Sequence, residues 1–428
     1  MRFADLTHRG GPHLPGAEAR TDLWHAGVWK AGPDADWSDR TARQRLVDAG
    51  LSRPNMAMKQ WTAQGAGASL LLPGRYPELA TLAVIASWRT ATVDQVAAIT
   101  GYRISRTMLD LMWASTLVSR GRLRADGAVG LPDLLRPTQS ADFDGLLGHR
   151  LPYVDWLGVT GGTRWVFGAQ ADRHNILAVE LALRVAEYTP IPCVLGETWA
   201  RLTRVFPDQS GIPPTAPWAG DAVFVRGDGL RIVVELTLTS SDKFADRCER
   251  WASLLARDTS RSVAVLFVEA RHPDHRGRAD RRVLPTMRGR IARAANGGMD
   301  RVAADVPKRM ALASWTDWFP ALGECSDRFL HLDVECPTGP ATGRWEAANL
   351  LDPFDVPGPG LSDVPVIANS RLLYATPHWL RSGPHPDPVG IVAAHSGITT
   401  IPHAVRPVRT AATRNATRAL VRTDRRTR

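Results

Sequence analysis

The alternation of apolar and polar side chains is most regular in residues 220–251. Between positions 230 and 238 an apolar residue occupies every even position, so one face of an extended strand is fully apolar. A shorter apolar run precedes it, and residues 242–257 have the spacing of an amphipathic helix. We therefore predict a strand, a tight turn, a second strand and a helix. One strand face should lie on a core, and the other should be free to carry a site.

The turn between the two strands decides which side chains become neighbours. With a three-residue loop, Gly227-Asp228-Gly229, and a left-handed Gly229, Asp221 lies opposite Glu235 on the same face. A two-residue loop would shift the register by one residue and separate the two carboxylates. We favour the three-residue loop because it gives a glycine to the position that needs a positive φ, although Asp-Gly also suits the shorter turn.

The flanking segments predict an α/β (α+β) fold. Residues 173–188 have the period of a helix, and 262–270 form the nearly continuous apolar run typical of a buried strand. A helix around 286–295 and a strand at 310–315 follow. This order is typical of a sheet with helices on its faces. Beyond about residue 332 proline and glycine become denser, and we expect regular structure to fade there.

A second unit is predicted upstream. Its expected elements are helices at 76–88, 92–101 and 104–115 and two short strands within 117–131. Thr92 is the predicted cap of the second helix, and Gly101 ends it. The turn from the second helix to the third is therefore tight.

Three helices with such a turn, followed by a hairpin, resemble a winged helix-turn-helix. The resemblance implies that the first residues of the third helix enter the major groove of DNA and that the hairpin contacts phosphates. The residues assigned to base edges are Arg103, Ser105, Arg106 and Thr107, and those assigned to phosphates are Arg120, Arg122 and Arg124. Use of the same module for protein contacts or dimerisation stays open.

Two carboxylates side by side on a hairpin, followed by a helix, resemble the core of the PD-(D/E)xK nucleases. In that fold an Asp and a Glu hold a divalent metal, and a lysine two residues after the Glu supports the attacking water. Asp221 and Glu235 are thus the candidate catalytic and metal-binding residues, with Mg²⁺ as cofactor if the site is active and none otherwise. Thr237 stands at the lysine position, so a fixed positive charge is missing.

Two further residues are candidates for that site. Lys243, in the first turn of the next helix, is the candidate substitute for the missing lysine. Glu180, in the helix before the hairpin, is a candidate third metal ligand. An ion pair with the arginine four residues later explains Glu180 equally well.

The order of these features resembles the replication-relaxation family, whose members occur on plasmids and other mobile elements of bacteria and are thought to act on plasmid DNA around replication. The family pattern is a His-led helix, a strand with Asp, a strand with Glu-x-Asp and a helix with a basic and an aromatic residue. The matching residues here are His174, Asn175, Asp221, Glu235, Arg247 and Trp251. Thr237 replaces the second Asp of the pattern, and Trp251 replaces its usual tyrosine.

The charged residues are distributed unevenly, and most of the excess positive charge lies at the C-terminus. The net charge is +10, and residues 404–428 contain one aspartate and eight arginines: Arg406, Arg409, Arg414, Arg418, Arg422, Arg425, Arg426 and Arg428. We expect a disordered basic tail that attracts phosphates or only solubilises the chain. The four cysteines form no CxxC pair, which argues against a zinc knuckle or a disulfide framework.

Neither a signal-peptide run nor an apolar segment of ~20 residues is present, so we expect a cytoplasmic protein without membrane contacts. The predicted parts are an irregular arm at 1–70, a winged helix-turn-helix at 71–135, a nuclease-like domain at 136–335, a Pro/Gly-rich extension at 336–403 and the basic tail.

The predicted function is that of a DNA-binding accessory protein of a plasmid or other mobile element, acting in replication or relaxation of its DNA. We expect its nuclease-like domain to be degenerate. The alternatives are an active metal-dependent endonuclease or nickase and a winged-helix transcriptional regulator. The expected partners are double-stranded DNA, replication or conjugation proteins of the same element, and a second copy of the chain.

Overall fold

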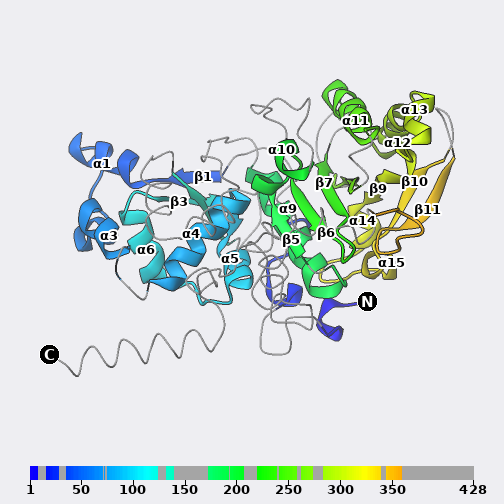
Figure 1. Ribbon diagram of the computed structural model, residues 1–428. Coiled ribbons are helices and arrows are strands. Elements are labelled where there is room, and N and C mark those ends of the chain that lie inside the picture. The colour runs from blue at the N-terminus through cyan, green and yellow to red at the C-terminus, as the bar shows by residue number, and fades with distance from the viewer. Residues whose placement is uncertain are drawn as a thin grey trace, which may run out of the picture.

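The computed structural model describes residues 1–7, 16–27, 35–70, 72, 75–123, 132–138, 172–191, 193–206, 219–238, 241–257, 262–272, 283–338 and 344–358. Within them the fold is mixed α/β, with two sheets on either side of a central helix, α9 (Asp172–Tyr188) (Figure 1). The expectation of an α/β (α+β) protein is confirmed at this level. In this part of the chain no helix is both long and apolar enough to cross a membrane.

The large sheet has the strand order β11-β10-β9-β8-β7-β6-β5. Its strands are β5 (Cys193–Gly196), β6 (Ala222–Val225), β7 (Arg231–Thr237), β8 (Val263–Glu269), β9 (Met310–Ser314), β10 (Asp333–Pro337) and β11 (Trp345–Asn349). The three central strands β7, β8 and β9 run parallel, and the outer pairings are antiparallel. β10 and β11 lie where regular structure was expected to fade, so that expectation is wrong for these residues.

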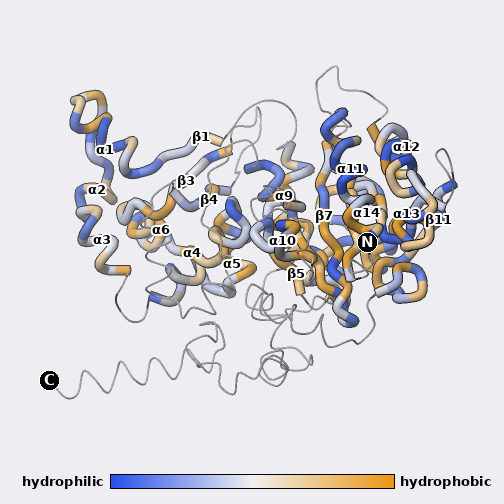
Figure 2. The backbone as a smooth tube through the Cα atoms, turned by 45° about the horizontal axis from the view of Figure 1, so that its top comes forward, coloured by the Kyte–Doolittle hydropathy of each residue, from blue (hydrophilic) through white to orange (hydrophobic). Residues whose placement is uncertain are grey.

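Both faces of the large sheet are covered. α11 (Asp242–Leu255) and α12 (Val283–Ala295) pack on the face that carries Val233 and Phe267, while α9 packs on the face that carries Ile232 and Val234. β7 is consequently buried along its whole length, and the prediction that one of its faces would be free is wrong. Figure 2 shows the hydrophobic stretch along β7 and the hydrophilic stretches on α11.

Shorter helices complete this half. They are α10 (Leu202–Val205), α13 (Met299–Ala303), α14 (Trp315–Trp318) and α15 (Asp327–Leu330), with single 3-10 turns at Glu197–Trp199 and Pro307–Arg309.

The small sheet has the strand order β1-β3-β4-β2 and is antiparallel throughout. Its strands are β1 (Ala35–Ser38), β2 (Ala91–Thr92), β3 (Val118–Leu123) and β4 (Asp133–Pro137), and its principal helices are α4 (Tyr76–Trp88), α5 (Val93–Thr100) and α6 (Arg106–Ala114). The predicted cap and stop of the second helix are confirmed. Thr92 and Gln95 form a capping box, and Gly101 is left-handed.

The predicted irregular arm contains regular structure. It comprises 3-10 turns at Phe3–Asp5 and Ala17–Ala19, strand β1, and the helices α1 (Arg40–Asp48), α2 (Met56–Gln60) and α3 (Ala63–Leu70). α2 and α3 pack against α6. The first turn instead packs against the other half of the molecule, where the Phe3 ring lies 4.7 Å from that of Tyr188 and 6.1 Å from that of Phe319. The N-terminal segment therefore contributes to both halves.

α9 carries charged residues into the interior. Glu180, Arg184 and Glu187 are each at most 2 % exposed. Arg20, from the N-terminal segment, donates to Glu180 at 3.1 Å and to Glu187 at 2.8 Å, and Arg184 contacts both Glu180 and Asp22 at 3.1 Å. The expected pair of Glu180 with Arg184 is confirmed, but it is buried rather than solvated. Such charges are tolerated only because each carboxylate has a cation beside it.

Arg20→Ala should strongly destabilise the protein, because it leaves two buried carboxylates with one arginine between them. We expect the free energy of unfolding to fall by about 3–5 kcal/mol, measured by urea titration at neutral pH. Arg45→Ala, which removes an exposed arginine of α1, is the control and should change it by no more than about 0.5 kcal/mol. Equal losses in the two variants would show that the cluster does not hold the N-terminal segment.

Candidate functional site

The hairpin of β6 and β7 brings the two predicted carboxylates together. Ala222 pairs with Val234, and the backbone N–H of Asp221 donates to the Val234 carbonyl at 2.7 Å, which places Asp221 opposite Glu235. The connecting loop has three residues, and Gly229 has a φ of +89°. The favoured register is therefore confirmed.

Asp221 is partly buried, and the Arg247 guanidinium is near enough to act on its carboxylate. Its Oδ2 accepts a hydrogen bond from the backbone N–H of Leu236 at 2.7 Å. Loss of hydration raises the pKa of Asp221 to about 7; the Leu236 hydrogen bond opposes this rise, and the nearby Glu197 carboxylate adds to it.

Glu235 is almost fully buried, and both of its oxygens have donors. Arg247 reaches Oε2 at 2.7 Å and Trp251 Nε1 reaches Oε1 at 2.8 Å. Arg247 and Trp251 are one helical turn apart on α11, so they approach the carboxylate from the same side. Burial raises the pKa of Glu235 to about 7, although Arg247 works in the opposite direction. Arg247 itself stays partly open, with 43 % of its side chain exposed.

The start of α9 completes this cluster. Burial is the main cause that lowers the pKa of His174, and its electrostatic neighbours include Arg247, Glu235 and Glu197. Asn175 donates to Glu197 at 2.8 Å, and Arg89 pairs with the same carboxylate at 3.2 Å. The residues on which the family resemblance rests therefore lie close together, although they come from three separate segments of the chain. We call this group the carboxylate cluster.

The sequence analysis discussed three more residues for this site, and each has surroundings that differ from those of Asp221 and Glu235. Glu180 belongs to the buried ion pairs of α9 with Arg20 and Arg184. Lys243 is exposed at the start of α11 and forms no ion pair with another described residue. Thr237 is buried, and its hydroxyl has no hydrogen-bond partner in the described part of the chain.

The carboxylate oxygens of Asp221 and Glu235 do not fit the role of ligands to a resident divalent metal. Both oxygens of Glu235 accept hydrogen bonds, one of them from a guanidinium, and one oxygen of Asp221 accepts from the backbone. Among the residues that the structure describes, no three His, Cys, Asp or Glu side chains gather around a point that could hold a metal ion. Since a divalent metal needs several oxygen or nitrogen ligands, the cluster is better suited to internal ion pairing.

A second candidate surface lies at the start of α6. Ser105 caps the helix by accepting from the backbone N–H of Met108 at 3.2 Å. Arg103, Arg106 and Thr107 are exposed around it. The predicted residues of the third helix are thus available to a partner, whereas Ser105 also has a structural role.

The predicted phosphate contacts on the hairpin are partly engaged by acids. Arg120 bridges Asp110 of α6 at 2.8 Å and Asp133 of β4 at 2.9 Å. Arg122 pairs with Asp133 at 3.3 Å but keeps 82 % of its side chain exposed. Arg124 lies outside the described residues. The ion pairs of Arg120 fix the hairpin against α6.

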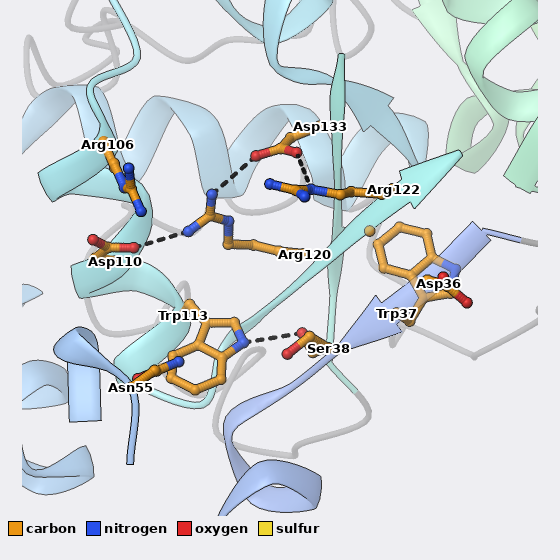
Figure 3. Close-up of a pocket in the computed structure, with 11 residues that line it drawn as sticks. Asp36, Trp37, Ser38, Asn55, Arg106, Asp110, Trp113, Arg120, Arg122 and Asp133 are labelled. Carbon is orange, nitrogen blue, oxygen red and sulfur yellow. Dashed lines mark hydrogen bonds and ion pairs between the residues drawn. The ribbon is translucent and has the colours of Figure 1, made fainter. Parts of the chain in front are cut away.

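A cavity of about 370 Å³ opens beside this network (Figure 3). It lies between α6, β1, the start of α2 and the β3–β4 hairpin, and its lining consists of Asp36, Trp37, Ser38, Asn55, Arg106, Asp110, Trp113, Arg120, Gly121, Arg122 and Asp133. We call it the α6 cavity. No sequence pattern predicted this cavity, because β1 and α2 come from the segment that was expected to be an irregular arm.

Sequence reasoning also missed Glu197, Arg89 and Arg20. Glu197 and Arg89 lie in short connections without periodicity, so no pattern linked them to the hairpin. No family model matches this chain, and comparisons with curated proteins and with solved structures gave no significant match.

The carboxylate cluster predicts a pH dependence of stability. Asp221 and Glu235 have raised pKa values in the folded protein, so the folded state retains protons that the unfolded state releases above about pH 4.5. The free energy of unfolding should therefore fall as pH rises from about 5 to 7.5, by on the order of 2 kcal/mol. Glu187, whose pKa burial raises to about 7, acts in the same direction.

Asp221→Asn should make this fall shallower, because the amide cannot ionise and the repulsion on Glu235 is lost. Urea titrations between pH 5 and pH 8 measure the slope. Asp246→Asn, at an exposed position of α11, is the matched control and should keep the wild-type slope. Identical slopes in all three proteins would contradict the assignment.

Proposed function

We propose that this chain is a DNA-binding accessory protein of a plasmid or other mobile element, acting around replication or relaxation of its DNA. The observation that carries the proposal is the exposed first turn of α6, where Arg103, Arg106 and Thr107 face solvent next to the hairpin that carries Arg122. Arginines at the start of a helix and on an adjacent hairpin are suited to base edges and phosphates, respectively.

The order of elements around α6 supports this proposal. Helix α4, strand β2, helices α5 and α6, and the β3–β4 hairpin follow one another as they do in winged helix-turn-helix modules. α6 packs against α2 and α3, and most of its residues from Met108 onward are buried, so its first residues are the ones open to a groove. This agrees with the common docking mode, in which the N-terminal residues of the recognition helix contact bases.

Charge in this half favours a polyanionic partner. Its described residues between 35 and 138 include twelve arginines and lysines but seven aspartates and glutamates. The excess is moderate, and the pairs of Arg120 with Asp110 and Asp133 reduce it locally. We therefore expect binding that depends on salt, with Arg103 and Arg106 as the main contributors.

In this proposal the region around Asp221 and Glu235 is a degenerate nuclease-like domain. Its support is that Arg247 and Trp251 occupy both oxygens of Glu235, and that Thr237 supplies no positive charge. Such a domain contributes contacts with the DNA backbone or with other proteins rather than cleavage.

Arg103→Ala and Arg106→Ala should each weaken binding to a duplex by about tenfold or more, since each removes a charged contact worth ~1–3 kcal/mol. Fluorescence anisotropy with a labelled duplex measures the change at fixed salt. Arg122→Ala should also reduce the slope of log K against log salt by about 1. Arg328→Ala, which removes an exposed arginine of α15 far along the chain, serves as the control. An affinity unchanged in all four variants would refute DNA binding through α6.

The purified protein should leave supercoiled plasmid uncut in both Mg²⁺ and Mn²⁺, because its carboxylates are committed to internal donors. Gel electrophoresis of the plasmid measures nicking, and Asp221→Ala provides the comparison. Metal-dependent nicking that disappears in Asp221→Ala would overturn the proposal of a degenerate site and favour an active nuclease.

A further inference from the structure

Residues 39–61, which contain α1 and α2, carry an excess of positive charge that acids do not balance. We call them the α1–α2 segment. Its two acids are Asp39 and Asp48, and its five cations are Arg40, Arg43, Arg45, Arg53 and Lys59. Asp39 accepts a hydrogen bond from the backbone N–H of Ala42 at 2.7 Å, and Asp48 accepts one from Gln44 at 2.8 Å. Both acids thus serve α1 itself, and neither forms an ion pair with another described residue.

Arg40 is a buried cation without an acid beside it. It is 8 % exposed, and its Nη1 has no hydrogen-bond partner in the described part of the chain. Loss of hydration lowers the pKa of Arg40, and no carboxylate opposes this fall. A buried guanidinium without a counter-charge is costly, so the field at the start of α1 favours the approach of an anion.

The other four cations are available to such an anion. Arg45, Arg53 and Lys59 are exposed, and Arg43 is half-buried. None of them forms an ion pair with another described residue. The Arg43 guanidinium donates to the Arg53 carbonyl at 3.2 Å, so the cations of α1 lie next to the connection that leads to α2.

The α1–α2 segment adjoins the first turn of α6. α2 packs on α6, and Asn55, which caps α2, lines the α6 cavity together with Arg106 (Figure 3). Arg53 comes two residues before Asn55, and Lys59 follows it by one helical turn. The cations therefore begin beside the proposed recognition turn and continue along α1. With nine residues, α1 is about 13 Å long, which is the rise of about four base pairs.

α1 has almost no packing of its own. It lies at the outer end of this half (Figures 1 and 2), and Arg40 is its one buried residue. A helix of this length is marginal in water by itself, so a partner would stabilise it. Leu46, Leu51 and Met56 are 43 %, 77 % and 73 % exposed, which suits a second copy of the chain. A symmetric contact would, however, bring two sets of cations together, so the charge favours a polyanion.

We propose that the α1–α2 segment binds the sugar-phosphate backbone of duplex DNA beside the site where α6 docks. This inference rests on the proposed DNA-binding function and extends it, because the DNA site becomes longer than α6 and its hairpin require. The added contacts go to phosphates, so they strengthen binding to every sequence and select none.

The salt dependence of binding tests this proposal, measured by fluorescence anisotropy of the full chain with a labelled duplex of about 30 base pairs. Arg45→Ala, Arg53→Ala and Lys59→Ala should each reduce the slope of log K against log salt by about 1, and the triple variant should reduce it by about 2–3. Arg45→Lys should keep the wild-type slope, because a phosphate contact requires a charge rather than a fixed fork. Arg328→Ala is again the control.

The outcomes separate this inference from the proposed function. A wild-type slope in the triple variant, while Arg106→Ala still weakens binding, would overturn the inference and leave DNA binding through α6 intact. Failure of the wild-type chain to bind any duplex would refute the proposed function itself. Light scattering after size exclusion tests the second copy as the occupant. A dimer that Leu51→Ser converts to a monomer, with the slope unchanged in the triple variant, would assign the segment to a dimer interface and contradict the proposal.

Discussion

A helix buried between two sheets can carry charge only if every charge has a partner, and α9 meets this condition with residues from distant parts of the chain. Arg20 and Asp22 neutralise Glu180, Glu187 and Arg184 in its middle. At its first residue, Asp172 accepts hydrogen bonds from Thr90 at 2.6 Å, from Arg136 at 2.8 Å and from Trp37. The small sheet is thereby tied to one end of the helix and the N-terminal segment to its middle. The positions of the carboxylate cluster and of the first turn of α6 both depend on this arrangement.

The carboxylate cluster places two buried acids opposite each other on one hairpin. The Arg247 guanidinium beside Glu235 supplies positive charge to this acid, and burial of both acids raises their pKa values. Arg247 remains partly exposed, so it can contact a partner while still pairing with Glu235. In the proposed function, the region around the carboxylate cluster therefore binds a partner and does not cleave DNA.

Local patterns predicted much of the fold. The hairpin register followed from one glycine with a positive φ, α4 from its apolar run, and α5 from its cap Thr92 and its stop Gly101. The burial of Glu180 and the packing of the N-terminal segment could not be predicted, because both depend on contacts across more than a hundred residues. From the sequence alone, Arg20 looks like a surface residue, because its partners Glu180 and Glu187 are far away along the chain. The α6 cavity was missed for the same reason.

The most direct measurement is hydrogen–deuterium exchange of the full chain with and without a duplex. The account predicts slower exchange on DNA binding at residues 101–110 and 118–123, where α6 begins and β3 lies, whether or not residues 221–251 also change. Protection confined to residues 221–251, with none around α6, would contradict it, because the carboxylate cluster and not the first turn of α6 would then be the surface that meets DNA.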